Sequence, residues 1–414
     1  MTALPAAPAG SARDRLLAFA GRPGLSRPLV LLEGPGGATH LAWGARSRRR
    51  LAWDAPADPA VLAPPGRRLY GTIAYEFGLP AGVPRRPPAV PQPLVDLFDP
   101  LNLVILDARG EVVRAEGPAA RECLAGPEPV AAEPDLPRAV GAPWRSFSQP
   151  EFEAAVRRAQ DLIAAGDIYQ VNLSVAERWS QAPDPWLLYL RLRAINPSPW
   201  MGFADFGDWQ LICGSPELLI ERTVRGVLRT RPIAGTRRKT GAPEADRRMR
   251  EELALDEKER AEHLMLVDLA RNDVGRISRY GTVAVAEREV VEEYSHVFHL
   301  VSEVRGVERP GTDAADVVAS LFPGGTITGC PKIRAMEIIG DLEPVARGAY
   351  TGALGWLDER ELQLNIVIRS AVVSGGLVLI QAGAGIVADS IPEREWKESL
   401  RKGAAVRAAL GLSE

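Results

Sequence analysis

The sequence predicts an α+β fold built from antiparallel sheets. Segments with the residue pattern of strands come in runs along the chain, and segments with the pattern of helices fall between those runs. A doubly wound parallel fold would instead alternate single strands with single helices. The chain has 414 residues, of which 46% are hydrophobic and 25% are charged, so it can form a substantial core in two or three average domains or in one large one.

The first third of the chain, residues 1–145, is predicted to be an N-terminal subdomain with a linker. Short strands separated by turn residues are expected at 29–32, 69–75 and 101–106. Residues 116–144 are rich in Ala, Pro and Glu, which is typical of a connecting loop. Residues 146–414 are predicted to form a second, larger domain.

The larger domain carries stronger signals. Ser148 and Glu151 form a capping-box pattern, so a helix is expected from there to about residue 165. A similar pattern, Ser390 to Glu393, is expected to begin the last helix. Further helices are expected at 254–270 and 332–340. Strands are expected at 168–176, as a pair at 209–221 and 227–233, and as a hairpin at 362–373 and 377–386 with its turn at 374–376.

Charge and composition exclude several classes of protein. The net charge of -3 gives no strong field for nucleic acid or an anionic membrane. The cysteines Cys123, Cys213 and Cys330 are odd in number and far apart, which indicates a reducing compartment and no zinc site. The first residues lack an apolar signal core, and no apolar run approaches ~18 residues. A cytoplasmic protein is therefore expected.

Two glutamates are candidate metal ligands. Helical spacing places Glu262 on the same face as apolar residues three, four and seven positions further on. An unpaired carboxylate there needs a metal, a cation or a proton, and a salt-bridged core glutamate is the ordinary alternative. Glu398 has Lys402 four residues later, a common exposed pair. Two glutamates from separate helices would nevertheless suit Mg²⁺ together with water and substrate oxygens.

Two glycine-rich turns precede predicted helices. The segment PGGTITGCPK, residues 323–332, can hold a carboxylate or phosphate on free backbone N–H groups, although it lacks the ending of a nucleotide P-loop. Gly383, Ala384 and Gly385 end a strand just before the last helix. Gly385 is equally compatible with close packing alone.

Three polar residues lie in apolar segments. Strand alternation puts Arg369 on one face with Asn365, and an arginine in so apolar a strand needs a carboxylate from the protein or a ligand. Glu217 has a similar context, and partial burial would raise its pKa and suit a general acid. His299 and Cys330, judged on their own segments, are interpreted as structural.

Taken together, these segments resemble the chorismate-utilising enzymes: the large subunits of anthranilate and aminodeoxychorismate synthases, isochorismate synthases and salicylate synthases. The N-terminal third resembles those subunits only through LVLLEG and YGTIAYEFG. The main resemblance covers residues 148–410, where the motifs follow the family order GDIYQVNLS, GSPELL, RPIAGT, AEHLMLVDLARNDVG, FPGGTITGCPK, RAMEII, GAGIVADS and EWKESLRK.

The resemblance implies a large sandwich of two antiparallel β-sheets flanked by helices, with residues 146–414 as the chorismate-binding catalytic domain. It implies that Glu262 and Glu398 hold Mg²⁺, which binds the ring carboxylate of chorismate. It also implies that Glu217 protonates the departing C4 hydroxyl and that His299 lies near the ring, where an anthranilate enzyme uses it to assist pyruvate loss. The residues implied to bind the substrate carboxylates are Gly235, Thr236, Thr328, Tyr350, Arg369, Gly383, Ala384, Gly385 and Lys402.

Two positions narrow the reaction within the family. Members that use water as nucleophile resemble this chain but carry a lysine base where it has Gln170, and a glutamine cannot deprotonate water. Amination by ammonia is therefore expected. Ala234 matches the PIAGT of anthranilate synthases, whereas many aminodeoxychorismate synthases have a nucleophilic lysine there. YQVNLS and GGTITGCPK favour the aminodeoxychorismate branch, and the LLES of the anthranilate branch's tryptophan site is LLEG here.

The sequence thus favours the aminodeoxychorismate branch, with the anthranilate branch as the alternative. None of the cysteines lies in the G-x-C-x-G setting of an amidotransferase nucleophile. A separate small subunit is therefore expected to hydrolyse glutamine and deliver ammonia. A catalytically inactive scaffold and a structural partner subunit are alternatives from other classes, and the intact acidic and anion-binding positions argue against both.

Overall fold

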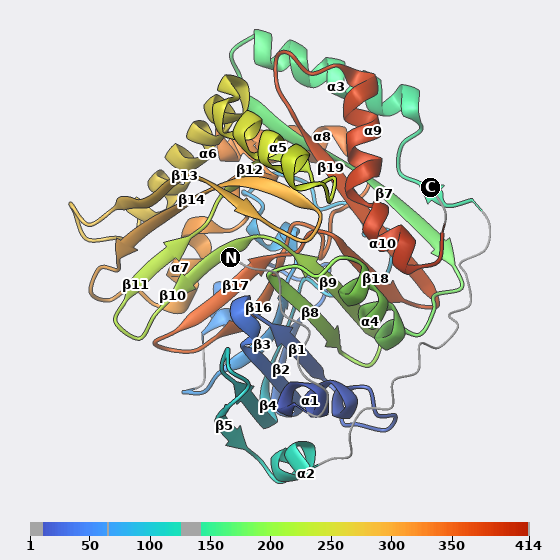
Figure 1. Cartoon of the computed structure of the whole chain (residues 1–414), viewed down its shortest axis with the longest axis vertical. Coiled ribbons are helices and arrows are strands. Elements are labelled where there is room, and N and C mark those ends of the chain that lie inside the picture. The colour runs from blue at the N-terminus through green and yellow to red at the C-terminus, as the bar shows by residue number, and fades with distance from the viewer. Residues whose placement is uncertain (1–10, 64–65, 126–141, 413–414) are drawn as a thin grey trace.

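The computed structural model describes residues 11–63, 66–125 and 142–412. Its helices surround a large sheet (Figure 1). They are α1 (Ala12–Ala20), α2 (Ala120–Ala125), α3 (Gln149–Ala164), α4 (Pro185–Ile195), α5 (Pro243–Leu255), α6 (Glu257–Gly275), α7 (Ala314–Leu321), α8 (Lys332–Leu342), α9 (Pro392–Lys402) and α10 (Ala404–Ala409), with short 3-10 turns η1 (Pro35–Gly37), η2 (Pro59–Leu62), η3 (Tyr75–Gly78) and η4 (Gly325–Ile327).

The named strands pair only in antiparallel fashion, which confirms the predicted α+β class. They are β1 (Leu29–Glu33), β2 (Thr39–Leu51), β3 (Leu69–Ile73), β4 (Val95–Leu106), β5 (Val112–Glu116), β6 (Trp144–Arg145), β7 (Gln170–Ser180), β8 (Trp200–Asp205), β9 (Trp209–Ser215), β10 (Leu218–Arg222), β11 (Val227–Thr230), β12 (Ile233–Arg238), β13 (Ala284–Glu293), β14 (Val297–Val307), β15 (Gly329–Cys330), β16 (Ala353–Leu357), β17 (Leu362–Ile366), β18 (Ser370–Ser374) and β19 (Leu377–Ile386).

The strands form two half-sheets joined through the long strands β2 and β4. The first half-sheet runs β4–β3–β16–β17–β10–β11–β14, with β12 and β13 both paired to β14. The second runs β2–β1–β8–β9–β18–β19–β7. Strands of the N-terminal third therefore pair directly with later strands, and the two predicted sheets are one hydrogen-bonded network. Residues 126–141 of the predicted linker lie outside the described residues.

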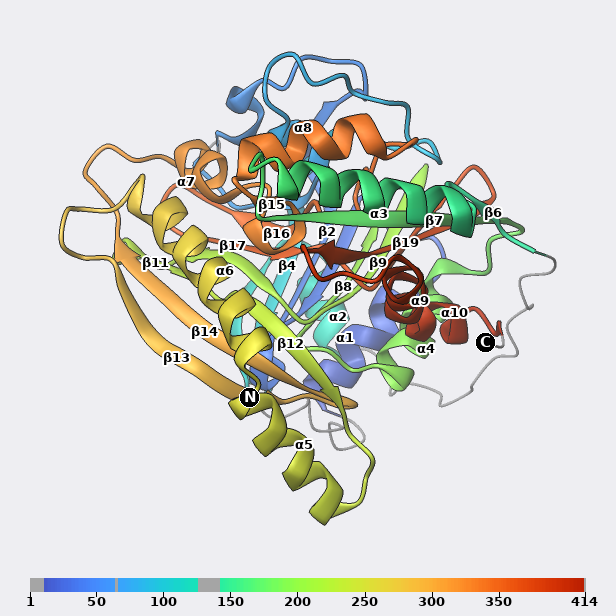
Figure 2. The same cartoon turned by 90° about the horizontal axis from the view of Figure 1, so that it is seen from above.

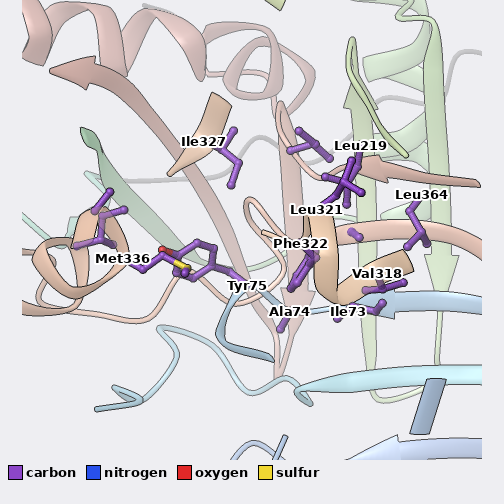
Figure 3. Packing of buried hydrophobic residues seen from close by; sticks show 14 of the residues in the cluster. Ile73, Ala74, Tyr75, Leu219, Val318, Leu321, Phe322, Ile327, Met336 and Leu364 are labelled. Atoms are coloured by element: carbon purple, nitrogen blue, oxygen red, sulfur yellow. The ribbon is translucent and has the colours of Figure 1, made fainter. Parts of the chain in front are cut away.

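Helices cover the two half-sheets differently. α6 packs across β11, β12 and β14, whereas α3 and α8 lie along β7 and α9 lies against β19 (Figure 2). A buried apolar cluster fixes the segment before the glycine-rich loop: Val318, Leu321 and Phe322 pack near Leu219 of β10 and Ile73 of β3 (Figure 3). The loop that follows is thereby held against the first half-sheet. Among the described residues, no helix is both long enough and apolar enough to cross a bilayer.

The predicted helix at 254–270 is wrong at its start. Two helices meet there, because α5 ends at Leu255 and Asp256 caps a new helix that continues to Gly275. The Asp256 carboxylate accepts hydrogen bonds from the backbone N–H groups of Lys258 and Glu259, each at 3.1 Å. The helix that carries Glu262 therefore has its own N-terminus one turn before that residue.

One capping box forms and the other does not. The Glu151 carboxylate accepts from the backbone N–H of Ser148 at 2.7 Å, as expected for α3. The predicted box at Ser390 is wrong, since α9 begins at Pro392 and its N-cap, Ile391, makes no side-chain bond. The Ser390 hydroxyl instead accepts from the backbone N–H of Val387 at 3.1 Å.

The hairpin of β18 and β19 is confirmed, with φ of 58° at Gly375 and 76° at Gly376 in its two-residue turn. The strands predicted at 209–221 and 362–373 are each interrupted where the chain passes between half-sheets. Arg369 has a φ of 51°, so the predicted shared face of Arg369 and Asn365 is wrong, because alternation stops at this break.

Candidate functional site

Glu217 and Arg369 lie where the chain crosses from one half-sheet to the other. Glu217 lies between β9 and β10, and Arg369 lies between β17 and β18. The backbone N–H of Gly214 donates to the carbonyl of Arg369 at 3.1 Å, and that of Ile366 donates to the carbonyl of Glu217 at 3.1 Å. Backbone hydrogen bonds therefore hold the two crossings side by side.

The carboxyl group of Glu217 is suited to donate a proton. Its side chain is buried, and the Thr326 hydroxyl donates to Oε1 at 2.8 Å. Burial raises the pKa of Glu217 to about 7, with the Thr326 hydrogen bond and the charge of Lys402 acting in the opposite direction. The burial expected from the sequence is confirmed, and the group titrates in the range where a general acid is most effective.

Arg369 offers a guanidinium group to a ligand. Within the described residues its side chain makes no hydrogen bond and no ion pair. Burial lowers the pKa of Arg369, and the charge of Glu398 raises it. An arginine in this state is a ready partner for a carboxylate.

His299 is neutral and presents one free nitrogen. Its Nδ1 lies 2.9 Å from the carbonyl of Gly235 and 3.2 Å from the Thr236 hydroxyl, so Nδ1 carries the proton. Burial, together with the positive charge of Arg369, lowers the pKa of His299 to about 4. Nε2 is buried without a hydrogen-bond partner. A bulge between Ala234 and Thr236 is what leaves the Gly235 carbonyl free for this contact.

Strands β7 and β19 form a wall with unpaired polar atoms. Asn172 lies opposite Gly385, and a Cβ on Gly385 would come within 2.5 Å of the Gln170 amide nitrogen. A Cβ on Gly383 would lie 2.8 Å from Asn172 Oδ1. Both glycines are thus required for close approach, while Ala384 faces the core. Gln170 Oε1 and Asn172 Oδ1 are buried without partners, as expected of groups that await a polar ligand.

Arg347 ties this wall to the glycine-rich loop. Its guanidinium donates to the carbonyls of Ile327 and Asn172, each at 2.7 Å, and to both carboxylate oxygens of Glu343, at 2.7 and 2.9 Å. Its backbone N–H donates to Glu76 of the N-terminal third at 2.7 Å. Sequence reasoning missed Arg347; the only signal was its position four residues after a glutamate.

Tyr350 and Thr328 lie next to this network. The Arg347 guanidinium is 6.0 Å from the centroid of the buried Tyr350 ring. The Thr328 hydroxyl donates to the carbonyl of Gly324 at 2.9 Å, and the Thr328 carbonyl accepts from the backbone N–H of Asn172 at 2.8 Å. In this state the Thr328 side chain closes the loop on itself.

An acidic rim lies on the facing sides of α6 and α9. It consists of the carboxylates of Glu259, Glu262, Glu395 and Glu398. Burial and the negative charges of Glu259 and Glu395 raise the pKa of Glu262, and burial with the charge of Glu398 raises that of Glu395. Glu259 and Glu395 were not singled out from the sequence. Their signal was spacing, because each lies three residues before a predicted ligand, on the same helical face.

This acidic rim is not closed around a single point. Arg401 donates to Glu398, Lys402 Nζ lies 3.9 Å from Glu398 Oε1, and Arg237 pairs with Glu259 at 3.1 Å. The described residues contain no group of three or more His, Cys, Asp or Glu placed to hold one ion. The repulsion felt by Glu262 and the hard oxygen donors nevertheless fit a divalent cation that takes its remaining ligands from water or substrate.

A model of the chorismate binding enzyme family matches residues 39–408. The chain belongs to this family. The match covers both half-sheets except β1, together with the glycine-rich loop and the acidic rim, and it confirms the family expected from the motifs.

Several relatives in the family are similar to this chain. Aminodeoxychorismate synthase component 1 of Bacillus subtilis is 50% identical over 279 residues, which are 67% of this chain and 59% of that protein. Anthranilate synthase component 1 of Aquifex aeolicus is 48% identical over 273 residues, 66% of this chain and 55% of that protein. The chain therefore matches less than two thirds of the length of these relatives.

Two solved structures share the fold. Anthranilate synthase component I from Streptococcus pneumoniae matches with a TM-score of 0.77 and 30% identity, over 89% of this chain and 92% of that one. The menaquinone-specific isochorismate synthase MenF of Escherichia coli matches with a TM-score of 0.76 and 22% identity, over 95% of this chain and 91% of that one. One architecture is therefore shared by this chain, an anthranilate synthase component and an isochorismate synthase.

Proposed function

We propose that this chain is a component 1 enzyme that aminates chorismate with ammonia to 4-amino-4-deoxychorismate. The observation that carries the proposal is Glu217, a buried carboxyl group with a pKa of about 7, held beside an unpaired Arg369 in a chorismate-binding fold. Protonated Glu217 would donate to the C4 hydroxyl as it departs, while Arg369 would bind a substrate carboxylate.

The wall formed by β7 and β19 is suited to bind ammonia. Gln170 supplies an amide and no base, so a water nucleophile would find no group there to deprotonate it. Free ammonia carries its own electron pair and needs only to be positioned. Gln170 and Asn172 have unpaired oxygens that can accept its hydrogens.

We further propose Mg²⁺ as the cofactor, held by Glu262 and Glu398. When bound, the ion would neutralise the rim carboxylates and fix the ring carboxylate of chorismate. The repulsion that raises the pKa of Glu262 supports this assignment, as do the hard oxygen donors that the glutamates of the two helices supply. Lys402, Gly235, Thr236, Tyr350, Thr328 and the 383–385 segment are proposed to complete the carboxylate sites.

A second candidate is the anthranilate branch, which produces anthranilate and pyruvate. Two observations favour it: Ala234 leaves no lysine nucleophile, and neutral His299 presents a free Nε2 that could accept a proton during pyruvate loss. The aminodeoxychorismate branch is favoured by YQVNLS and GGTITGCPK. The relative at 50% identity belongs to the aminodeoxychorismate branch, and the relative at 48% identity belongs to the anthranilate branch.

The proposed partner is a separate glutamine amidotransferase, and the proposed location is the cytoplasm. The name component 1 on the relatives implies a second component in those proteins. The cysteines of this chain are free, as a reducing compartment would keep them.

Mass identification of the product tests the proposal. The chain would be incubated with chorismate, ammonium and Mg²⁺, with and without a lyase specific for aminodeoxychorismate. We expect a product of aminodeoxychorismate mass that the lyase converts. Anthranilate formed without the lyase would assign the chain to the other branch, and an absence of any amination would refute the proposal.

A further inference from the structure

A small cavity lies beside Glu217 on the α6 side. Its volume is about 30 Å³, and its polar lining consists mainly of Glu217, Thr326, Thr230 and Asp273. Leu266 and Ala270 of α6 are among its apolar walls. None of the residues proposed to bind the substrate carboxylates lines it. A cavity of this size with several polar groups is suited to one water molecule.

Asp273, which lines the cavity, forms a buried ion pair with Lys332. Lys332, the first residue of α8, donates from Nζ to Asp273 Oδ2 at 2.6 Å and to the carbonyl of Leu321 at 3.1 Å. The side chain of Asp273 is 7% exposed and that of Lys332 is 11% exposed, so the lysine reaches the surface. Glu217 and Asp273 are the titratable residues that line the cavity.

The proposed reaction creates a need for such a connection. Glu217 gives its proton to the C4 oxygen, the C4–O bond breaks with its electron pair on oxygen, and water leaves. Ammonia forms the new C–N bond and the product amine keeps its third hydrogen as an ammonium group near neutral pH, as alkylamines do. Glu217 is then a carboxylate, and each turnover requires one proton from outside the substrate.

We propose that one water molecule in this cavity relays a proton from the Asp273–Lys332 pair to Glu217 after each turnover. Lys332 first passes its proton to the Asp273 carboxylate. Asp273 then gives this proton to the water as the water gives one of its own to the Glu217 carboxylate, and Lys332 regains a proton from solvent. The inference rests on the proposed function, since only a proton-donating Glu217 needs resupply.

The electrostatics of the pair support the relay. Burial lowers the pKa of Lys332 and raises the pKa of Asp273, with the partner's charge acting in the opposite direction in each case. Both shifts reduce the cost of the intermediate state in which the proton lies on Asp273. A purely structural ion pair has no need of a cavity that leads to the general acid.

The replacement Asp273→Asn tests the relay by its kinetics. Asparagine keeps the size and can accept from Lys332, but it cannot pass a proton as a carboxyl group does. At a pH below 7 Glu217 starts mostly protonated. The first turnover should then run at the wild-type rate and later ones about tenfold slower, less than the ~10² lost with the acid itself. Rapid-quench assays with chorismate, ammonium and Mg²⁺ should therefore show a burst of one product per enzyme.

A second variant addresses the water directly. Ala270→Val should fill the cavity and produce the same burst, with an unchanged KM for chorismate. The matched control is Ala319→Val on the exposed face of α7, which should behave as wild type. Thermal melts of all three chains would establish that they are folded.

The outcomes separate the two levels of the proposal. A crystal structure of the wild type should show one ordered water in the cavity, lost in Ala270→Val. Wild-type turnover with no burst in either variant, or a first turnover as slow as the later ones, would overturn the relay and leave the proposed function intact. A wild-type chain that does not consume chorismate with ammonium would contradict both.

Discussion

The site has a strand side, around Glu217 and Arg347, and a helix side, formed by the glutamates of α6 and α9. The two sides differ in how far they are assembled. On the strand side, Thr326 donates a hydrogen bond to the buried Glu217, and the buried Arg347 donates to the carbonyls of Ile327 and Asn172. On the helix side, Glu398 is 28% exposed and bound to Arg401, itself 65% exposed, and Glu262 has only like charges and Lys258 around it. The acid and the anchoring arginine of the first region are held in place by protein partners, although Gln170 and Asn172 keep unpaired oxygens for a ligand. The metal-binding glutamates of the second region have no such support.

This contrast indicates that the two regions act at different stages of substrate binding. Backbone crossings and a buried arginine place the acid and the anion-binding wall before substrate arrives, which lowers the cost of orientation during reaction. The glutamates of α6 and α9 repel one another and are proposed to converge only when a divalent cation and a substrate carboxylate join them. Perturbing the two regions should therefore have distinguishable consequences.

The largest effect is expected on the helix side. Glu262→Gln or Glu398→Gln removes an anionic ligand of the proposed Mg²⁺ and should abolish turnover without unfolding the chain. Steady-state assays beside thermal melts would measure this. Glu393→Gln is the control on the same helix, because Glu393 is 58% exposed and pairs only with Lys397. Near-normal turnover in both ligand variants would exclude the metal assignment.

On the strand side, Glu217→Gln should lower kcat by on the order of 10² or more, the usual contribution of a positioned general acid. The pKa of about 7 also predicts a pH dependence. The acid form is lost as pH rises through that value, so kcat at constant free ammonia should fall above it. At constant total ammonium, rising free ammonia would oppose this fall. A Glu217→Gln variant with most of its activity would rule out the acid role.

The sequence was informative about elements and weaker about their junctions. Periodicity identified the hairpin of β18 and β19, and the motifs identified Glu217 and Arg369. Neither periodicity nor the motifs could show that the strands predicted at 209–221 and 362–373 break near these residues. The breaks arise because the chain crosses between the half-sheets there. Arg347 was missed for the same reason, since its partners Ile327 and Asn172 are distant in the chain and are backbone carbonyls.

Helix boundaries show a similar limit. The apolar pattern around Glu262 continues back past residue 256, so periodicity alone did not reveal the separate α6, which the local bonds of Asp256 begin. Glu259 and Glu395 were passed over because exposed-looking glutamates are common on helices. Only the facing arrangement of α6 and α9 distinguishes them from solvated side chains.

An intermediate effect is expected for the buried pair of Arg347 and Glu343, which holds β7 against the glycine-rich loop. Arg347→Met should raise the KM for chorismate about tenfold, by a displacement of the loop and β7. It should also destabilise the fold by about 3–5 kcal/mol, because Glu343 is left buried and unpaired. Glu343→Gln with Arg347→Met should recover most of the melting temperature and little of the KM. If the double variant regains normal KM, Arg347 has no positioning role.

The smallest effect concerns the exposed partner of Glu398. Arg401→Ala releases this carboxylate and should lower the Mg²⁺ concentration for half-maximal rate by up to about fivefold, the range of a surface pair. Arg394→Ala, exposed on the same helix, should leave it unchanged. A weaker response to Mg²⁺ in Arg401→Ala would show that Arg401 assists the rim rather than competes with the ion.

Calorimetric titration of Mg²⁺ with and without chorismate, in the absence of ammonium, most directly tests the claim that the helix side assembles around its ligands. We expect weak Mg²⁺ binding alone, at least tenfold tighter binding with chorismate, and the same factor for chorismate when Mg²⁺ is saturating, as linkage requires. Both effects should vanish in Glu262→Gln. Equal Mg²⁺ affinity with and without chorismate, or wild-type coupling in Glu262→Gln, would contradict the account.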